Sequence, residues 1–283
     1  MPYFGLGLHI GDTESDSQVG PTPPAGGGGG FSNTYSVDFD GTDDYVDTGS
    51  TFQSTYQSSH TISFWFKLNN ISIFQGLFGA WSGPTSQNAI YFDAAGSTIT
   101  HRYRVASNPK ATTISAFTPD TNWHHYAVTL EQNGSNLIVK AYLDGVYKST
   151  VSNAITMSGF SQSNNSYIGL RNGRTNYLNG KMDEVAIIGS ALSDGGVSVG
   201  QQAQGDIETL YNDGVPGDIS SSLSPVAWYR MGDTGSDYGT STITNAANPG
   251  TNDATIPNAT GGTNTSGAAF HDLSTAPDSI YVA

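Results

Sequence analysis

The sequence contains no cysteine among its 283 residues, which excludes a disulfide framework, a thiolate metal site and a cysteine nucleophile. Basic residues are also scarce, because ten Lys and Arg stand against 24 Asp and Glu and give a formal net charge of −14. Since phosphate contacts need clustered Lys and Arg, this balance argues against binding to nucleic acid or anionic membranes. No apolar run approaches the roughly 20 residues of a membrane-spanning helix, so no membrane insertion is expected.

Apolar and aromatic residues, at 36% and 11% of the chain, suffice for a packed core. Between residues 33 and 188 they fall in short segments rich in β-branched and aromatic side chains, each bounded by Gly, Asn, Asp or Ser. Asp144-Gly145 separates two such segments and is typical of a tight hairpin. Because these segments follow one another with no helical stretch among them, the sequence predicts an all-β fold, an antiparallel two-sheet jelly-roll sandwich.

The predicted core of this sandwich consists of the largest apolar side chains of these segments. They are Phe39, Ile62, Phe64, Phe66, Leu77, Trp123, Val128, Leu130, Leu143, Ile168, Val185 and Ile187.

Five of the segments carry motifs in a characteristic order. They are FDGTDDYV at 39–46, TISFWF at 61–66, WHHYAVTL at 123–130, AYLDG at 141–145 and GKMDEVAII at 180–188. Together they resemble the laminin-G-like branch of the concanavalin A-like lectins and glucanases, over about Asn33 to Leu192. The resemblance implies a concanavalin A-like sandwich and glycan binding as the commonest role.

The chain divides into four predicted parts. Residues 1–30 form an N-terminal anchor peptide with a Pro/Gly linker, 31–195 the laminin-G-like sandwich, 196–223 a short helix with a linker, and 224–283 a C-terminal extension. The extension resembles the beginning of other family members, although it stands here after the sandwich. Two explanations remain open: a permuted chain whose tail supplies the missing first strand, or a second, incomplete repeat.

The first ten residues alternate apolar side chains with glycine and polar residues. The apolar ones are Tyr3, Phe4, Leu6, Leu8 and Ile10, and a Pro- and Gly-rich linker follows. An extended segment of this kind can add a strand to the sheet edge of a neighbouring protein, so we predict an anchor. A disordered tail is the alternative. The segment lacks a basic region and a long apolar stretch, so it is not expected to be a signal peptide.

Catalysis is not expected. Glycoside hydrolysis needs two carboxylates that flank the bond, and the resemblance implies an ExDxxE array on one strand for its retaining glucanases. None of the four glutamates stands in such an array. Asp183 and Glu184 are neighbours, and neighbours on a strand face opposite sides, so we predict that they do not act together. The same argument predicts a structural role for His124 and His125.

Aspartate is abundant, with 20 Asp against four Glu, and it is dense in the predicted turns. Hard cations such as Ca²⁺ prefer carboxylate and carbonyl oxygens. The resemblance implies a structural Ca²⁺ held by Asp183 of the closing strand, with Asp40, Asp43 and Asp44 as contributors. The alternative is that these carboxylates only cap turns.

Glycan binding needs an exposed aromatic ring together with side chains that bond sugar hydroxyls. The candidate ligand-binding residues are Trp81, Arg102, Tyr103, Arg171, Asn172, Arg174 and Asn176. The segment from Arg171 to Tyr177 is the best of these, and a plain polar hairpin tip is its alternative interpretation.

The Gly-rich start and the WYRMGD segment at 228–233 resemble structural proteins of marine bacteriophages. We therefore predict a non-enzymatic virion decoration protein on a capsid or tail. Its N-terminus would contact other virion proteins, its sandwich would face host glycans at the virion surface, and homo-oligomerisation would supply avidity. A secreted or cell-surface bacterial lectin is the alternative, and a glucanase the third hypothesis.

Overall fold

The computed structural model describes residues 31–83, 85–106, 108–114, 120–172, 175–257 and 269–273. The predicted anchor residues Tyr3, Phe4, Leu6, Leu8 and Ile10 lie outside the described residues, as does Arg174.

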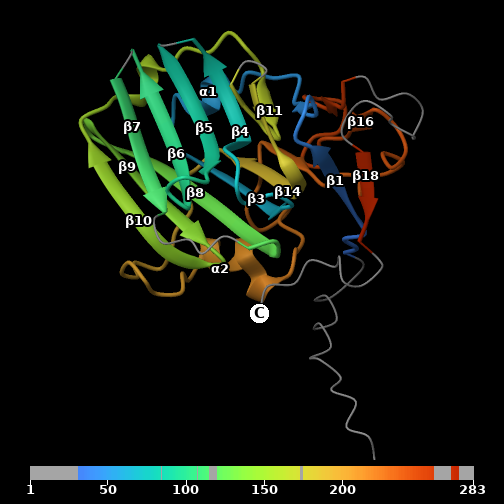
Figure 1. Cartoon of the computed structure of the whole chain (residues 1–283). Coiled ribbons are helices and arrows are strands. Elements are labelled where there is room, and N and C mark those ends of the chain that lie inside the picture. The colour runs from blue at the N-terminus through green and yellow to red at the C-terminus, as the bar shows by residue number, and fades with distance from the viewer. Residues whose placement is uncertain are drawn as a thin grey trace, which may run out of the picture.

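Two eight-stranded antiparallel sheets face each other and form a sandwich (Figure 1). Sheet A has the order β10-β9-β8-β3-β14-β1-β18, with β15 paired to β14, and sheet B the order β16-β17-β2-β11-β4-β5-β6-β7. The strands of sheet A are β1 (Tyr35–Asp40), β3 (His60–Leu68), β8 (Trp123–Asn133), β9 (Asn136–Leu143), β10 (Val146–Asn153), β14 (Asn179–Ile188), β15 (Ala227–Tyr229) and β18 (Ala269–Asp272). Those of sheet B are β2 (Val46–Asp47), β4 (Gln75–Ser82), β5 (Ser86–Asp93), β6 (Thr98–Val105), β7 (Asn108–Ile114), β11 (Ser166–Ile168), β16 (Thr242–Ile243) and β17 (Ala254–Thr255). The predicted all-β jelly-roll architecture is confirmed.

A small hairpin and four short helical turns complete the described part of the fold. The hairpin consists of β12 (Leu170–Asn172) and β13 (Thr175–Tyr177). The turns are α1 (Gln53–Tyr56), η1 (Met157–Gly159), α2 (Asp206–Tyr211) and η2 (Asn212–Gly214). No helix in the described part of the chain is long and apolar enough to cross a bilayer.

The main core lies between the two sheets. Every predicted core residue is buried, and all but one belong to this central cluster. The exception is Trp123, which packs with Trp65, Tyr211 and Leu273 outside the central cluster. Full burial of a large apolar side chain is worth about 1.5–3 kcal/mol, so the central cluster dominates the stability of the sandwich.

A second apolar layer covers the outer face of sheet A. Ile207 and Leu210 of α2 pack with Tyr142 and Ala186, strand residues that point away from the main core. The segment after β14 therefore closes one outer face of the sandwich.

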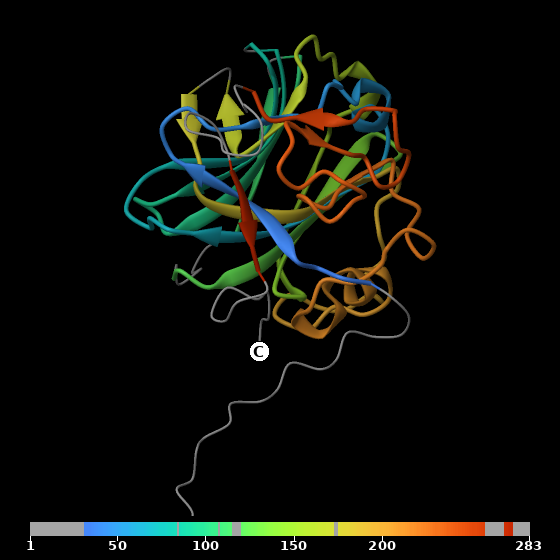
Figure 2. The ribbon, with the colours of Figure 1, turned by 90° about the vertical axis from the view of Figure 1, so that its right-hand side faces the viewer.

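The C-terminal segment pairs with strands of its own chain. β15 pairs with Val185–Ile187 of β14, on the edge where β1 pairs with Asn179–Met182. β18 lies beside β1, and β16 and β17 extend sheet B through β2 (Figure 2). Of the two explanations of this segment, the pairing supports the permuted chain, because β15 supplies a strand in line with β1.

Candidate functional site

The outer face of sheet B presents a row of side chains from β4, β5 and β6. Alternate residues of β5 point inward, because Ile90 and Phe92 belong to the main core. The intervening residues Gln87, Ala89 and Tyr91 therefore face outward. The register places Trp81, Gln87 and Arg104 in one row across the strands, and Gly79, Ala89 and Arg102 in the next.

The β12–β13 hairpin lies directly on this face. A Cβ atom on Gly76 would lie 2.1 Å from the backbone nitrogen of Arg171, and one on Gly79 would lie 2.3 Å from its carbonyl oxygen. Only a residue without a side chain allows this approach. The two glycines thus let the hairpin backbone dock on β4 and fix the position of Arg171.

Two guanidinium groups contact the same aromatic ring on this face. The Arg171 Cζ atom lies 4.1 Å from the centroid of the Tyr91 ring, and the Arg102 Cζ atom lies 5.8 Å from it. Phe74 stacks on Tyr91 at 5.0 Å between centroids, and Arg171 also contacts it at 4.9 Å. Tyr91 is only 5% exposed, so its ring forms a buried support for the two guanidinium groups.

Burial lowers the pKa of Arg171, and the positive charge of Arg102 adds to this effect. Tyr91 and Asp93 act in the opposite direction. In the described part of the chain, neither arginine has a carboxylate within ion-pair distance, and the buried Nε of Arg171 has no hydrogen-bond partner. Within the described residues, the positive charge of these two arginines is therefore not neutralised by an ion pair.

Three predicted ligand residues, Trp81, Arg102 and Arg171, share this face. Asn176 is exposed on the hairpin, with φ of 65°, whereas the side chain of Asn172 is not described. Phe74 and Tyr91 carry no local sequence signal of a site, because strand pairing and the docked hairpin bring them here.

The prediction for Tyr103 is wrong. Its side chain is fully buried, stacks on Phe160 at 5.2 Å and donates a hydrogen bond to the carbonyl of Tyr56. Tyr103 lies in strand β6, where neighbouring residues alternate, so Arg102 and Tyr103 point to opposite faces. Tyr103 cannot stack on a sugar.

Three of the four predicted calcium ligands meet in the turn after β1. Carboxylate oxygens of Asp40, Asp43 and Asp44 lie within 4.8 Å of one another. Burial raises the pKa of Asp44 to about 6, with a contribution from the charges of Asp40 and Asp43, and its buried Oδ1 lacks a hydrogen-bond partner. A hard divalent cation would neutralise this repulsion and bond that oxygen, so these residues fit Ca²⁺.

The fourth predicted ligand, Asp183, is not at this turn. Asp40 lies opposite Asn179, whereas Asp183 lies four residues further along β14, or about 13 Å away. Its carboxylate accepts hydrogen bonds from Asn33 Nδ2 at 3.0 Å and from the backbone of Glu184 at 2.7 Å. The expectation that Asp183 shares a cation with Asp40 is therefore wrong.

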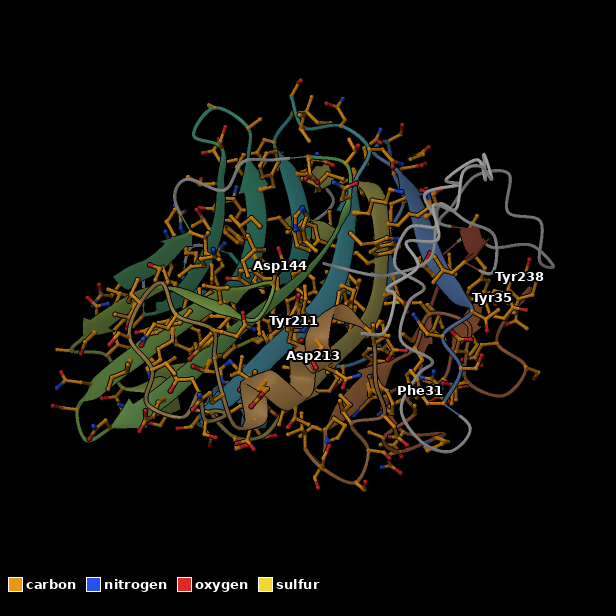
Figure 3. The ribbon with its side chains drawn as sticks, turned by 90° about the horizontal axis from the view of Figure 1, so that it is seen from below. Phe31, Tyr35, Asp144, Tyr211, Asp213 and Tyr238 are labelled. Carbon is orange, nitrogen blue, oxygen red and sulfur yellow. The ribbon has the colours of Figure 1, made fainter. Side chains whose placement is uncertain are left out.

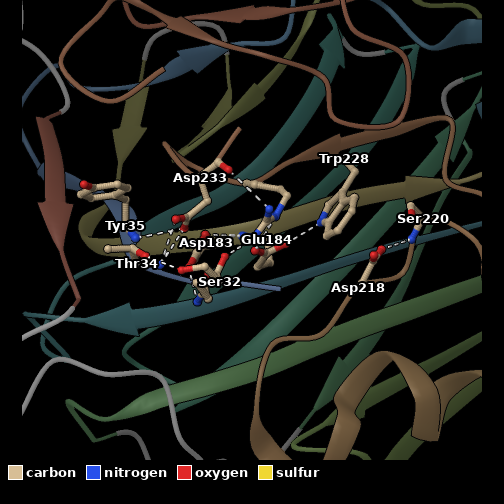
Figure 4. Close-up of polar contacts among 11 residues, drawn as sticks. Ser32, Thr34, Tyr35, Asp183, Glu184, Asp218, Ser220, Trp228 and Asp233 are labelled. Carbon is tan, nitrogen blue, oxygen red and sulfur yellow. Dashed lines mark hydrogen bonds and ion pairs between the residues drawn. The ribbon is translucent and has the colours of Figure 1, made fainter. Parts of the chain in front are cut away.

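The expectation that Asp183 and Glu184 face opposite sides is also wrong. The register between β14 and β3 shifts between Asp183 and Ala186, and Glu184 has a positive φ of 48°. This bulge breaks the alternation and brings both carboxylates into one polar cluster with Asp233 (Figure 4).

Each carboxylate of this cluster accepts hydrogen bonds from the backbone or from a neighbouring side chain. Glu184 accepts hydrogen bonds from Trp228 Nε1 and from Arg230 Nε, and Asp233 accepts the backbone N–H groups of Thr34 and Tyr35. Burial raises the pKa of Glu184 to about 7, although Arg230 opposes the shift. The cavity beside Glu184 measures about 10 Å³, which leaves no room for a sugar. The cluster joins the start of β1 to β14 and to the segment after β15.

The described chain begins next to this cluster, on the outer side of sheet A. Phe31 packs on the second apolar layer, and the Arg230 guanidinium lies 4.2 Å from its ring and 5.1 Å from that of Trp228. The two rings are parallel within 2°. Phe31 and the nearby Tyr35–Tyr238 stack are labelled together in Figure 3. An open pocket of about 400 Å³ is lined by Phe31, Trp228, Arg230, Asp218 and Asp233.

The two adjacent histidines have separate surroundings. His124 lies between Asp120 and Asp144, at 3.0 and 2.8 Å, and these carboxylates raise its pKa against the effect of burial. His125 is buried and bonded to Ser63 Oγ at 2.8 Å. Their partners agree with the structural role predicted for both.

Comparison with known proteins places this fold in a family. No curated protein matches the chain. A sialidase carbohydrate-binding module (CBM40) of Ruminococcus gnavus is similar in structure, with 13% identity, a TM-score of 0.44 and coverage of 56% of this chain and 92% of its own. The LG4-5 domains of mouse laminin alpha1 are 12% identical, with a TM-score of 0.45 and coverage of 62% and 48%. Similarities this distant carry no functional conclusion.

The family model of the concanavalin A-like lectin/glucanases superfamily, Laminin_G_3, matches residues 40–198, more than half of the 283-residue chain. It covers four of the five motifs in full and most of the first. The chain therefore belongs to the concanavalin A-like lectin/glucanase superfamily, in its laminin-G-like branch.

Proposed function

We propose that this protein is a non-enzymatic glycan-binding domain whose ligand face is the outer face of β4, β5 and β6. The observation that carries the proposal is the pair of guanidinium groups, Arg102 and Arg171, held on one aromatic ring without a carboxylate partner in the described chain. Guanidinium N–H groups are rigid donors for sugar oxygens. Trp81 lies in the next row, about 7 Å further along β4 than Gly79. Its side chain is partly exposed and offers an aromatic surface.

The position of Phe31 supports display of this face away from an attachment point. Phe31 lies on the outer side of sheet A, whereas the two arginines lie on the outer side of sheet B. A partner that holds residues 1–30 would therefore meet the chain on the side opposite the arginines. We propose that this partner is a virion protein of a bacteriophage capsid or tail, and that homo-oligomers at the virion surface add avidity. A secreted or cell-surface bacterial lectin is the alternative.

The surroundings of the buried acids support a non-enzymatic role. Asp183 and Glu184 are close together but are engaged by Asn33, Trp228 and Arg230. Glu184 borders a cavity of about 10 Å³, too small for a glycosidic bond between two acids. For the turn at Asp40, Asp43 and Asp44 we propose a structural Ca²⁺.

A glycan array on the full chain tests the ligand face. We expect the wild type to bind at least one glycan class, and the Arg102→Gln/Arg171→Gln variant to lose most of this signal. Lys148→Gln is the matched control, because it removes one positive charge from an exposed position on β10. An array without any bound glycan contradicts the function, and binding that survives the double substitution contradicts the site.

Deletion of residues 1–30 tests the attachment. We expect the shortened protein to bind glycans as before but to be lost from particles that carry the full chain. Particle association that survives the deletion contradicts the anchor, and recovery of the full chain only from the medium favours the secreted lectin. Release of reducing sugars from polysaccharides would contradict the non-enzymatic role.

A further inference from the structure

Several basic residues of the described chain form ion pairs with carboxylates. Lys140 pairs with Asp194 at 2.8 Å, Arg230 with Glu184 at 3.2 Å and Lys181 with Asp38 at 3.5 Å. In a chain of net charge −14, carboxylates are plentiful partners. Arg102 and Arg171 nevertheless have no such ion pair among the described residues, and both lie at the Tyr91 ring on the outer face of sheet B.

The two guanidinium groups repel each other across one ring. Both lie within 5.8 Å of the Tyr91 centroid, and the charge of Arg102 disfavours the charged form of Arg171. Asp93 acts on Arg171 through its charge but does not form an ion pair with it. Burial removes part of the water that would screen this repulsion. A ligand with a negative charge would relieve the repulsion, whereas a neutral ligand would leave it in place.

The hydrogen-bonding chemistry of the two guanidinium groups also suits such a ligand. The buried Nε of Arg171 lacks a hydrogen-bond partner. Planar guanidinium groups bind carboxylate and sulfate through two parallel N–H···O bonds, which are stronger than bonds to neutral hydroxyls.

We propose that the glycan bound by this face is acidic, and that Arg102 and Arg171 bind a carboxylate or sulfate group on one of its sugars. This inference rests on the proposed glycan-binding function and adds the chemical class of the ligand. A purely structural role for Arg171, as packing between the hairpin and Phe74, is the competing explanation. Substitution of Arg102 distinguishes the two explanations, because Arg102 lies 5.8 Å from the Tyr91 ring and does not hold the hairpin.

Titration calorimetry with matched oligosaccharides tests the inference on the full chain. One pair is a sulfated galactan fragment and its desulfated form, and the other is a polyuronate fragment and its carboxyl-reduced form. We expect at least one acidic member to bind roughly tenfold or more tightly than its neutral counterpart, with an affinity that falls as salt is added. The acidic member that binds identifies the group as sulfate or carboxylate.

Variants connect this preference with the two arginines. Arg102→Gln should weaken acidic binding by roughly tenfold, and Arg102→Lys, which keeps the charge but loses the planar fork, by less. Lys148→Gln should have no effect. Equal binding of acidic and neutral members overturns the inference and leaves the proposed function in place, whereas no binding of any glycan contradicts the proposed function itself. Acidic binding that persists unchanged in Arg102→Gln overturns the assignment to this face.

Discussion

His60 and His101 are buried in the main core and joined through one amide. His60 Nδ1 donates to the carbonyl of Ser58 at 2.8 Å, so its Nε2 accepts from Asn88 Nδ2 at 3.0 Å. The Asn88 oxygen then accepts from His101 Nε2 at 2.8 Å. This order fixes both rings as neutral tautomers, and it leaves His101 Nδ1 without a partner.

Protonation of these histidines should destabilise the fold in acid. Burial lowers the pKa of His60 to about 4 and that of His101 to about 3, below the ordinary value of 6.5. Below pH 6.5 the unfolded chain therefore binds more protons than the folded chain. Because protons then favour the unfolded state, stability that is present above pH 6.5 is lost as the pH falls. His101→Gln removes one such group. The free energy of unfolding of this variant, measured in urea at pH 7.5, 6, 5 and 4.5, should therefore rise relative to that of the wild type as the pH falls. This difference should grow by about 1.4 kcal/mol for each pH unit below 6.5. A difference between variant and wild type that stays constant with pH would contradict the prediction.

Asp44 allows a direct test of the calcium proposal. We expect millimolar Ca²⁺ to raise the melting temperature of the wild type at pH 7.5 and EDTA to lower it, with no response in Asp44→Asn. A ligand at 100 times its dissociation constant stabilises by about 2.7 kcal/mol. Because the pKa of Asp44 is raised to about 6, the response should fade as the pH falls below that value. Asp183→Asn is the control that should keep the response. An unchanged wild-type melting temperature in EDTA removes the proposal.

At the scale of the elements, local composition predicted the strands, but it predicted neither the bulge in β14 nor the hairpin that docks on β4. Motifs such as WHHYAVTL and GKMDEVAII fall within β8 and β14, because β-branched and aromatic side chains suit a pleated, half-buried surface. The bulge at Glu184 has no such signal, since strict alternation was the natural assumption. The docked hairpin has none either, because Gly76 and Gly79 contact a segment about 90 residues away along the chain.

The docking of the hairpin can be tested at Gly79. A methyl group there would lie 2.3 Å from the Arg171 carbonyl oxygen, so Gly79→Ala should force the hairpin off β4. We expect a loss of about 1–3 kcal/mol in the free energy of unfolding, measured in urea, together with weaker glycan binding. Gly96→Ala is the matched control, because its methyl group would meet only the Thr98 side chain at 3.3 Å. Equal stability of the two variants would show that the hairpin does not rest on this contact.

At the scale of the whole molecule, the two outer faces of the sandwich are covered differently. The outer face of sheet A is covered by α2 and by Phe31, whereas that of sheet B carries the hairpin and the arginines. The sequence predicted a sandwich with an extension, but it left open where the extension folds. Pairing between distant segments depends on the shape of an edge that forms only in three dimensions, so Ala227–Tyr229 could not be assigned to β14 beforehand.

The C-terminal segment should therefore be indispensable to the sandwich, although the family match ends at residue 198. Tyr229, Met231, Ile243 and Ile256 are at most 3% exposed in the main core. At about 1.5–3 kcal/mol each, their loss approaches the 5–15 kcal/mol by which whole domains are stable. We expect a chain that ends at Leu223 to lose its near-UV circular dichroism and its cooperative urea transition, and the separate 224–283 fragment to restore both in part. A cooperative, wild-type-like transition in the shortened chain would instead show that the sandwich is complete without these strands, with β14 stable at an open edge.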